Sequence, residues 1–208
     1  MINNSTDCLL VIDVQNDFCA NGALAVPDGD AVVSIINRQS EKFKHRILTQ
    51  DWHPADHQSF ASNHDGKNPF DLIELDYGSQ VLWPDHCVQG SSGAEFHGDL
   101  ITDGAELILR KGFRAEIDSY SAFFENDQTT PTGLTGYFRN RGFSRLFMAG
   151  LATDFCVAYS ALDARKEGFE VFLIEEGCRA IDMNGSLDDA LGKMRDAGVN
   201  WVSSKNLS

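Results

Sequence analysis

The stretch RLFMAGLATDFCVAYSALDAR, residues 145–165, has the pattern of a buried strand, a turn and a helix. Residues 145–149 are short and apolar, as expected of a buried strand, and residues 157–165 are typical of a helix. Parallel α/β sheets are built from this strand-turn-helix unit. The turn ends at Cys156, and free N–H groups at a helix start favour a thiolate and can bind an oxyanion. One turn could therefore supply a nucleophile and its oxyanion hole.

The same alternation of strand and helix extends along the chain in both directions. Strands are expected at 8–12, 46–50, 106–110, 146–149, 170–174 and 200–203, and helices at 28–43, 132–141, 157–168 and 187–197. This order predicts an α/β three-layer sandwich, with a mostly parallel six-stranded sheet and helices on both faces. The length fits one domain, residues 1–208. Residues 51–104 form a long polar connection, and the sequence leaves open whether 64–80 form an ordered lid.

Composition limits the classes of partner. The formal net charge of −14 disfavours nucleic acid and anionic membranes, and no segment is apolar for the roughly 20 residues of a membrane span. The five cysteines include no C-x-x-C pair, which indicates a reducing, cytoplasmic setting. The sequence leaves the oligomeric state open, and a homo-oligomer is compatible with it.

Four chemically active residues follow predicted strands. Asp13, Asp51, Lys111 and Cys156 each stand at or just after the carboxyl end of a strand. Sites in parallel sheets form at that edge, so these residues are expected on one rim. Asp13 can accept the thiol proton of Cys156 and later act as a general acid, while Lys111 stabilises the thiolate. The alternatives are a structural Asp13–Lys111 ion pair and a cysteine that only packs in the core.

A metal site is predicted beside them. In an extended segment, Asp51 and His53 point the same way and can face one metal ion. Two histidines and a carboxylate suit Zn²⁺, Mn²⁺ or Fe²⁺. The third ligand is one of four histidines, His57, His64, His86 and His97. The alternative is that these histidines are ordinary loop residues. That alternative is favoured for His97, and also for His45, which is not among the four.

The chain resembles the nicotinamidase family, within the isochorismatase-like cysteine hydrolases. The matching motifs are DVQNDF at 13–18, TQDWHP at 49–54, WPDHCV at 83–88, KG at 111–112 and GLATDFCV at 150–157. The resemblance extends from about Cys8 to Val202. Each motif is short, but five in order at predicted strand ends are highly specific.

The resemblance implies a role for each matching residue. It implies that Asp13, Lys111 and Cys156 form a catalytic triad, and that Asp51, His53 and His86 bind one divalent metal. Some family members have a further ligand where Ser59 stands, and we expect water to bridge or replace a serine there. The resemblance also implies a cis peptide bond between Leu151 and Ala152, with the N–H groups of Ala152 and Cys156 as oxyanion hole. The implied substrate-binding residues are Phe18, Leu24, Trp83 and Tyr120, for which core packing is the alternative.

The implied reaction is hydrolysis of nicotinamide to nicotinate and ammonia through a cysteine thioester, in NAD salvage. The substrate is then a small molecule, with pyrazinamide as a second expected substrate. One alternative is a related amidohydrolase acting on a carbamoyl or ureido group, whose family members generally lack the Asp-x-His and His metal set. A nucleotide- or flavin-binding module is disfavoured, because the first strand leads into Asp13 and Asp17 instead of a glycine-rich loop. A catalytically silent small-molecule-binding protein on the same fold is the remaining alternative.

Overall fold

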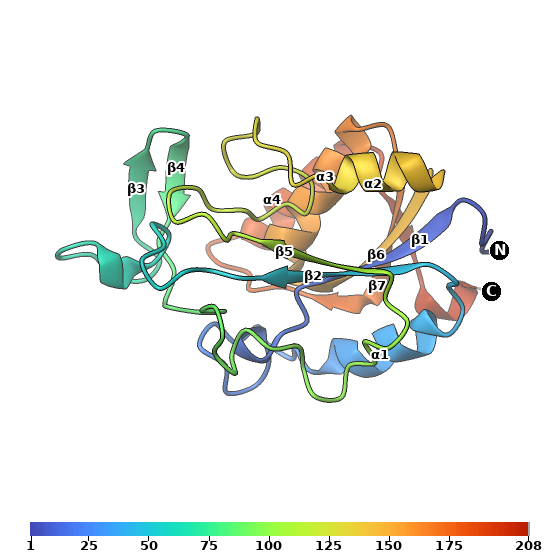
Figure 1. The fold of residues 1–208 in the computed structure, drawn as a ribbon, viewed down its shortest axis with the longest axis horizontal. Coiled ribbons are helices and arrows are strands. Elements are labelled where there is room, and N and C mark those ends of the chain that lie inside the picture. The colour runs from blue at the N-terminus through green and yellow to red at the C-terminus, as the bar shows by residue number, and fades with distance from the viewer. Residues whose placement is uncertain (208) are drawn as a thin grey trace.

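The computed structural model describes residues 1–207 and is built around one six-stranded parallel sheet (Figure 1). Its strands are β1 (Asp7–Ile12), β2 (Arg46–Asp51), β5 (Leu107–Lys111), β6 (Arg145–Leu151), β7 (Glu170–Arg179) and β8 (Asn200–Val202). Every pair of neighbouring strands in this sheet is parallel. The predicted α/β architecture is confirmed, and β7 is longer than the sequence pattern indicates.

The strand order places a change of winding direction at the middle of the sheet. The order is β5-β2-β1-β6-β7-β8, so the chain builds outward from β1 to one side and then from β6 to the other. In such sheets a crevice opens at the carboxyl ends of the two central strands. Asp13 follows β1, and Cys156 follows β6, so both stand beside this crevice.

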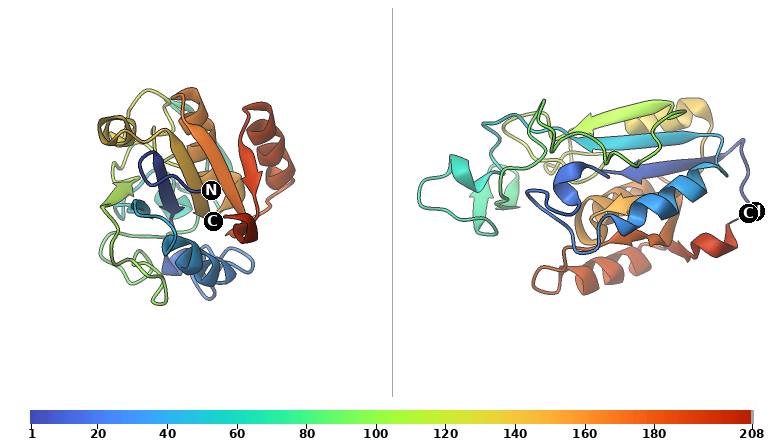
Figure 2. Two further views of the ribbon diagram at one scale, coloured as in Figure 1. Left: turned by 90° about the vertical axis from the view of Figure 1, so that its right-hand side faces the viewer. Right: turned by 90° about the horizontal axis from the view of Figure 1, so that it is seen from below.

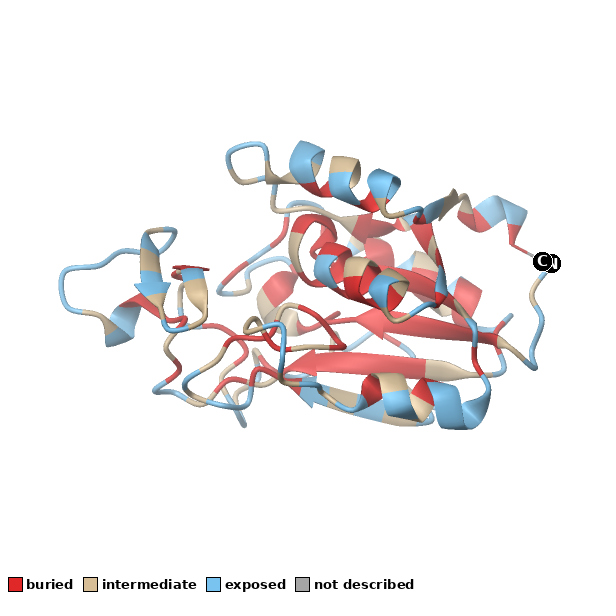
Figure 3. Cartoon of the chain, turned by 90° about the horizontal axis from the view of Figure 1, so that it is seen from above, coloured by how far each residue is buried: buried red, intermediate tan, exposed pale blue. Residues whose placement is uncertain are grey.

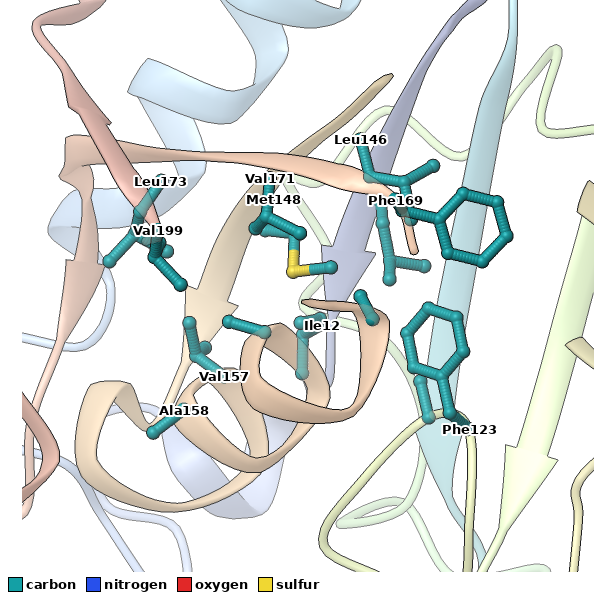
Figure 4. Packing of buried hydrophobic residues seen from close by; sticks show 14 of the residues in the cluster. Ile12, Phe123, Leu146, Met148, Val157, Ala158, Phe169, Val171, Leu173 and Val199 are labelled. Carbon is teal, nitrogen blue, oxygen red and sulfur yellow. The ribbon is translucent and has the colours of Figure 1, made fainter. Parts of the chain in front are cut away.

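Both faces of the sheet are buried, because successive side chains of a strand point to opposite sides. Along β1, Cys8, Leu10 and Ile12 enter one core, whereas Leu9 and Val11 enter the other. Figure 4 shows the first core, where Ile12, Leu146 and Met148 pack against residues from the helical side. These continuous apolar strands explain why the sequence pattern located the sheet.

The helices cover the two faces unequally. The α-helices are α1 (Ala31–Ser40), α2 (Leu134–Arg141), α3 (Ala158–Lys166) and α4 (Ser186–Asp196). Short single-turn helices occupy η1 (Asn16–Phe18), η2 (Ala61–Asn63), η3 (Thr153–Val157) and η4 (Ser204–Asn206). Helix α1 packs on one face, and α2, α3 and α4 lie over the other (Figures 1 and 2). No helix in residues 1–207 combines the length and apolar character of a membrane span.

The helices start up to three residues away from the predicted positions. Helix α1 begins at Ala31 instead of residue 28, because Asp28 has a φ of 56°, which a right-handed helix does not accommodate. The helix after β6 is preceded by η3, a π-helical turn. Cys156 therefore lies inside a wide turn that continues into α3, and not at the first position of an α-helix.

The long connection between β2 and β5 contains regular structure that the sequence did not indicate. Strands β3 (Leu72–Leu75) and β4 (Gly78–Val81) form an antiparallel hairpin. Figure 1 shows this hairpin beyond the carboxyl ends of the parallel strands, and Figure 3 shows that much of its surface is exposed. The hairpin thus lies beyond the edge of the sheet that carries the predicted site (Figure 1).

Candidate active site

The three residues of the predicted triad meet at the carboxyl edge of the sheet. Lys111 Nζ lies 2.9 Å from Asp13 Oδ2 and donates a hydrogen bond of 3.4 Å to Cys156 Sγ. A carboxylate oxygen of Asp13 and the sulfur of Cys156 lie within 4.8 Å of each other. Each of the three residues is buried. Three residues at or after the ends of three separate strands are thus brought together at one place.

Lys111 is a buried cation held between two acidic side chains. It also donates hydrogen bonds to Asp51 Oδ1 at 2.5 Å and to the carbonyl of Ser119 at 2.8 Å. Burial alone lowers the pKa of Lys111, but the carboxylates of Asp13 and Asp51 outweigh it and raise the pKa well above its usual value. Lys111 therefore remains an ammonium ion and balances part of the buried negative charge.

Burial has the largest effect on the pKa of the Cys156 thiol. Burial raises the pKa of the Cys156 thiol well above its usual value, and Lys111 only partly opposes this effect. A helix start favours a thiolate, but burial acts in the opposite direction here and has the larger effect on the pKa. Burial also raises the pKa of Asp13, whose Oδ1 accepts a 2.6 Å hydrogen bond from Thr49 Oγ1. A buried carboxyl next to a buried thiol is suited to accept the thiol proton and to return it.

A group with the donor set of a metal site adjoins the triad. The ligand atoms of Asp51, His53 and His86 lie within 4.8 Å of one another, and all three residues are buried. His53 Nε2 lies 3.3 Å and His86 Nε2 3.7 Å from Asp51 Oδ2. In each ring Nδ1 is engaged, His53 Nδ1 with Gly112 O at 2.9 Å and His86 Nδ1 with Pro84 O at 2.8 Å. These bonds hold both Nε2 atoms toward Asp51, so the residues fit a divalent cation.

Backbone contacts hold these ligands in place. The Gln15 side chain donates to Asp51 O and accepts from Asp51 N, both at 2.8 Å, and fixes the end of β2. The two segments that carry the histidines pair through His53 N to Cys87 O at 3.0 Å and Trp83 N to Ser59 O at 2.7 Å. The polar connection between β2 and β5 is therefore tied together where it supplies ligands. Gln15 is a functional neighbour that the sequence reasoning did not single out, although it lies in the first motif.

The remaining candidate ligands are distributed differently. His57 is buried against His53, with ring centroids 4.3 Å apart, and its Nδ1 is 2.7 Å from Ser59 Oγ. His57 also forms a second close group with His53 and Asp118. In contrast, His64 bonds to the carbonyl of Gln58, and His97 pairs with the exposed Asp30. Neither belongs to a close group with Asp51, and the role of Ser59 as a water-mediated ligand stays a prediction.

An aromatic pocket reaches both Cys156 of the triad and the metal-type ligands Asp51 and His86. Its lining includes the four predicted residues Phe18, Leu24, Trp83 and Tyr120, together with Asp51, His86, Ala152 and Cys156. It also includes Asp118, Phe155 and Ile181, which the sequence reasoning missed. Phe155 meets Trp83 edge to face with ring centroids 4.9 Å apart. Phe155 directly precedes Cys156 in the same motif, and this position was the one signal in the sequence that could have assigned it to the pocket.

The predicted oxyanion hole borders the same pocket. Ala152 and Cys156 both line it, and the peptide bond between Leu151 and Ala152 is cis, as the family resemblance implied. The Ala152 carbonyl accepts from Phe155 N and Val157 N, each at 3.1 Å, and anchors the π-helical turn to β6. The function of the two N–H groups stays a prediction.

The site thus combines a buried thiol, a carboxylate and an amine with a metal-type ligand set. The sequence profile of the isochorismatase domain matches residues 7–206. The nicotinamidase of Acinetobacter baylyi is 53% identical over 199 residues, covering 96% of this chain and 93% of that protein. The chain belongs to the nicotinamidase family of isochorismatase-domain proteins. A solved nicotinamidase/pyrazinamidase of Acinetobacter baumanii is 55% identical, covers 98% of this chain and 99% of its own, and has a TM-score of 0.97.

Two further solved nicotinamidase-family structures carry ligands. A protein of L. infantum in complex with nicotinate is 38% identical, covers 100% of this chain and 97% of its own, and has a TM-score of 0.87. A pyrazinamidase of Pyrococcus horikoshii in complex with zinc is 34% identical, covers 95% of this chain and 98% of its own, and has a TM-score of 0.76. The similarity therefore extends over almost the whole chain in each case.

Proposed function

We propose that this chain hydrolyses nicotinamide to nicotinate and ammonia, with Cys156 as nucleophile. The observation that carries the proposal is the meeting of Cys156, Asp13 and Lys111 at the base of an aromatic pocket, beside Asp51, His53 and His86. The relatives named nicotinamidase support the same assignment. The reaction serves NAD salvage, and the five free cysteines agree with a cytoplasmic protein.

In the first half of the reaction, Asp13 takes the proton of the Cys156 thiol as the sulfur bonds to the carboxamide carbon. The backbone N–H groups of Ala152 and Cys156 then stabilise the oxyanion, a contribution of about 3–4 kcal/mol for one donor. Asp13 returns its proton to the amide nitrogen, the C–N bond breaks, and ammonia leaves. The product bound to the enzyme is a thioester of Cys156. Lys111 keeps its charge throughout and stabilises whichever of its neighbours is anionic.

In the second half, Asp13 accepts a proton from water as the water oxygen bonds to the thioester carbon. The C–S bond breaks, Asp13 returns its proton to the sulfur, and the carboxylic acid product loses its remaining proton to solvent and leaves as nicotinate. Phe18, Trp83 and Tyr120 hold the pyridine ring between them, with Leu24 at the edge of the pocket. This flat, aromatic pocket favours a pyridine or pyrazine carboxamide, including pyrazinamide, over a carbamoyl or ureido group.

We assign Asp51, His53 and His86 as ligands of one divalent cation, with zinc as the first choice among zinc, iron and manganese. Two imidazoles and a carboxylate suit zinc and leave positions open, and the related pyrazinamidase was solved with zinc. A cation held there would supply a Lewis acid for the ring nitrogen of the substrate. We expect Ser59 to act only through a bridging water, because its hydroxyl lies 2.7 Å from His57 Nδ1.

The test is ammonia release from nicotinamide by the purified protein, before and after treatment with a chelator, with metal content measured in parallel. We expect ammonia and nicotinate in equal amounts, loss of turnover with loss of metal, and recovery on adding zinc. Release of ammonia from a ureido compound but not from nicotinamide would instead favour the alternative amidohydrolase. Absence of turnover on all these substrates by a fully metallated protein would favour a silent binding protein.

A further inference from the structure

One buried side chain outside the pocket lining connects the β3–β4 hairpin to the pocket wall. Gln80, on β4, is 1% exposed. Its Nε2 donates to Asp118 Oδ2 at 2.8 Å and to the Tyr120 hydroxyl at 3.0 Å. Asp118 and Tyr120 both line the pocket that holds Cys156. The side-chain amide of Gln80 thus contacts two pocket residues without itself lining the pocket.

The other end of the same amide is bound to the hairpin and to the adjacent loop. Gln80 Oε1 accepts from the Tyr77 hydroxyl at 3.0 Å and from Asn126 Nδ2 at 3.2 Å. The donors at Oε1 and the carboxylate at Nε2 fix which end of the amide is which. Because every polar atom of this buried side chain is paired, its orientation is determined by the network.

The contacts continue from these partners to the reacting groups. The Tyr120 hydroxyl also accepts from Trp83 Nε1 at 3.0 Å, so Gln80 and Trp83 share one acceptor. Asp118 is followed by Ser119, whose carbonyl accepts from Lys111 Nζ at 2.8 Å. A shift of this loop would move the aromatic wall of the pocket first, and the amine of Lys111 after it.

We propose that Gln80 is a positioning residue for the substrate pocket, and that it makes the β3–β4 hairpin part of the binding site. The proposal rests on the proposed function, because the ligand it positions is the pyridine ring of the carboxamide substrate. Gln80 acts through Asp118 and Tyr120 and touches no reacting atom. Its loss should therefore weaken substrate binding more than it slows the chemical step.

The test compares three variants of the whole protein. Gln80→Leu removes all the hydrogen bonds of the Gln80 side chain and leaves a side chain of similar size. Gln80→Glu keeps the shape of the side chain but places a second carboxylate beside Asp118. Ser79→Ala is the matched control, because Ser79 is exposed on the same strand and bonds only to Glu74. The measurements are kcat and KM for nicotinamide, the Kd of nicotinate by calorimetry, and thermal unfolding.

We expect KM and the nicotinate Kd to rise about tenfold in Gln80→Leu and Gln80→Glu, which is the size of one lost polar interaction. The change in kcat should be smaller, and Ser79→Ala should match the wild type. If Gln80→Leu fails to fold, Gln80→Glu carries the test. Unchanged KM and Kd in the folded variants, or the same shift in Ser79→Ala, would overturn the positioning role while wild-type turnover stands. A wild-type protein without nicotinamide turnover would overturn both this role and the proposed function.

Discussion

The amine nitrogen of Lys111 lies 3.4 Å from the sulfur of Cys156, although the two residues are 45 positions apart in the sequence. The contact exists because β5 and β6 end at the same edge of the sheet, with β2 and β1 between them. The two intervening strands supply Asp51 and Asp13, and Lys111 contacts both carboxylates. One ammonium ion therefore links the predicted nucleophile, its acid–base partner and a predicted metal ligand.

Replacing Lys111 by methionine should both stop turnover and destabilise the fold. The variant leaves the carboxylates of Asp13 and Asp51 buried without their cation, and breaking a buried pair costs about 3–5 kcal/mol. Arg139→Met is the control, because Arg139 is exposed and pairs with Glu167, which is also partly exposed. A surface pair is worth about 0–1 kcal/mol. Urea denaturation of both variants measures the difference, and equal losses would contradict the role assigned to Lys111.

Replacing Gly112 by alanine should lower metal content although Gly112 is not a ligand. Gly112 has a φ of +65°, and a Cβ there would lie 2.4 Å from His53 Cε1. The carbonyl of Gly112 also accepts from His53 Nδ1, so displacing the ring disturbs both nitrogens. Loss of such a supporting contact typically weakens metal affinity about 10–100-fold. Metal analysis after dialysis checks this.

The control for that experiment is Gly136→Ala. Gly136 lies in α2, and a Cβ there meets no atom within 4 Å. This variant should keep full metal content and gain slight helix stability. If Gly112→Ala also keeps full metal content, the assignment of His53 as a ligand is contradicted.

A pH-dependent contribution to stability is expected far from the site, at Glu176 on β7. Hydrogen bonds from Ser203 and Ser204 lower the pKa of Glu176 from 4.5 to about 2 in the folded protein. A depressed pKa stabilises the fold above the unfolded pKa, and the stabilisation is lost as the pH falls toward the folded pKa. The difference in unfolding free energy between the wild type and Glu176→Gln should therefore shrink between about pH 6 and about pH 3.

The adjacent Glu175 supplies the control for this pH experiment, since it is exposed on the same strand. Glu175→Gln should show a smaller pH-dependent difference from the wild type than Glu176→Gln does. If the gap between Glu176→Gln and the wild type were constant over the pH range, the hydrogen bonds to the C-terminal segment would not be the cause.

The sequence predicted the sheet most directly from its central strands β1 and β6, which are buried on both faces and contain continuous apolar runs. Once the strands were placed, the rule that sites form at their carboxyl ends brought Asp13, Asp51, Lys111 and Cys156 to one rim. The exposed hairpin was not predicted, because the residues of β3 alternate between exposed and half-buried and form no apolar run.

The site residues that lie on loops could not be predicted from the sequence either. Spacing alone could not separate His86 from His57, because both are buried beside His53 and only the fold shows which faces Asp51. Asp118 and Ile181 reach the pocket from distant loops with no periodic signal. The direction of the pKa shift of Cys156 depends on its burial, which a motif does not reveal.

The most direct test of the central claim is to identify the covalent intermediate during nicotinamide turnover. The reaction is quenched in acid, the protein is digested, and the peptides are examined by mass spectrometry. We expect a nicotinoyl group on the peptide that contains Cys156, and neither adduct nor turnover in a folded, metallated Cys156→Ala variant. An adduct on another residue, or ammonia release by Cys156→Ala at the wild-type rate, would contradict the account.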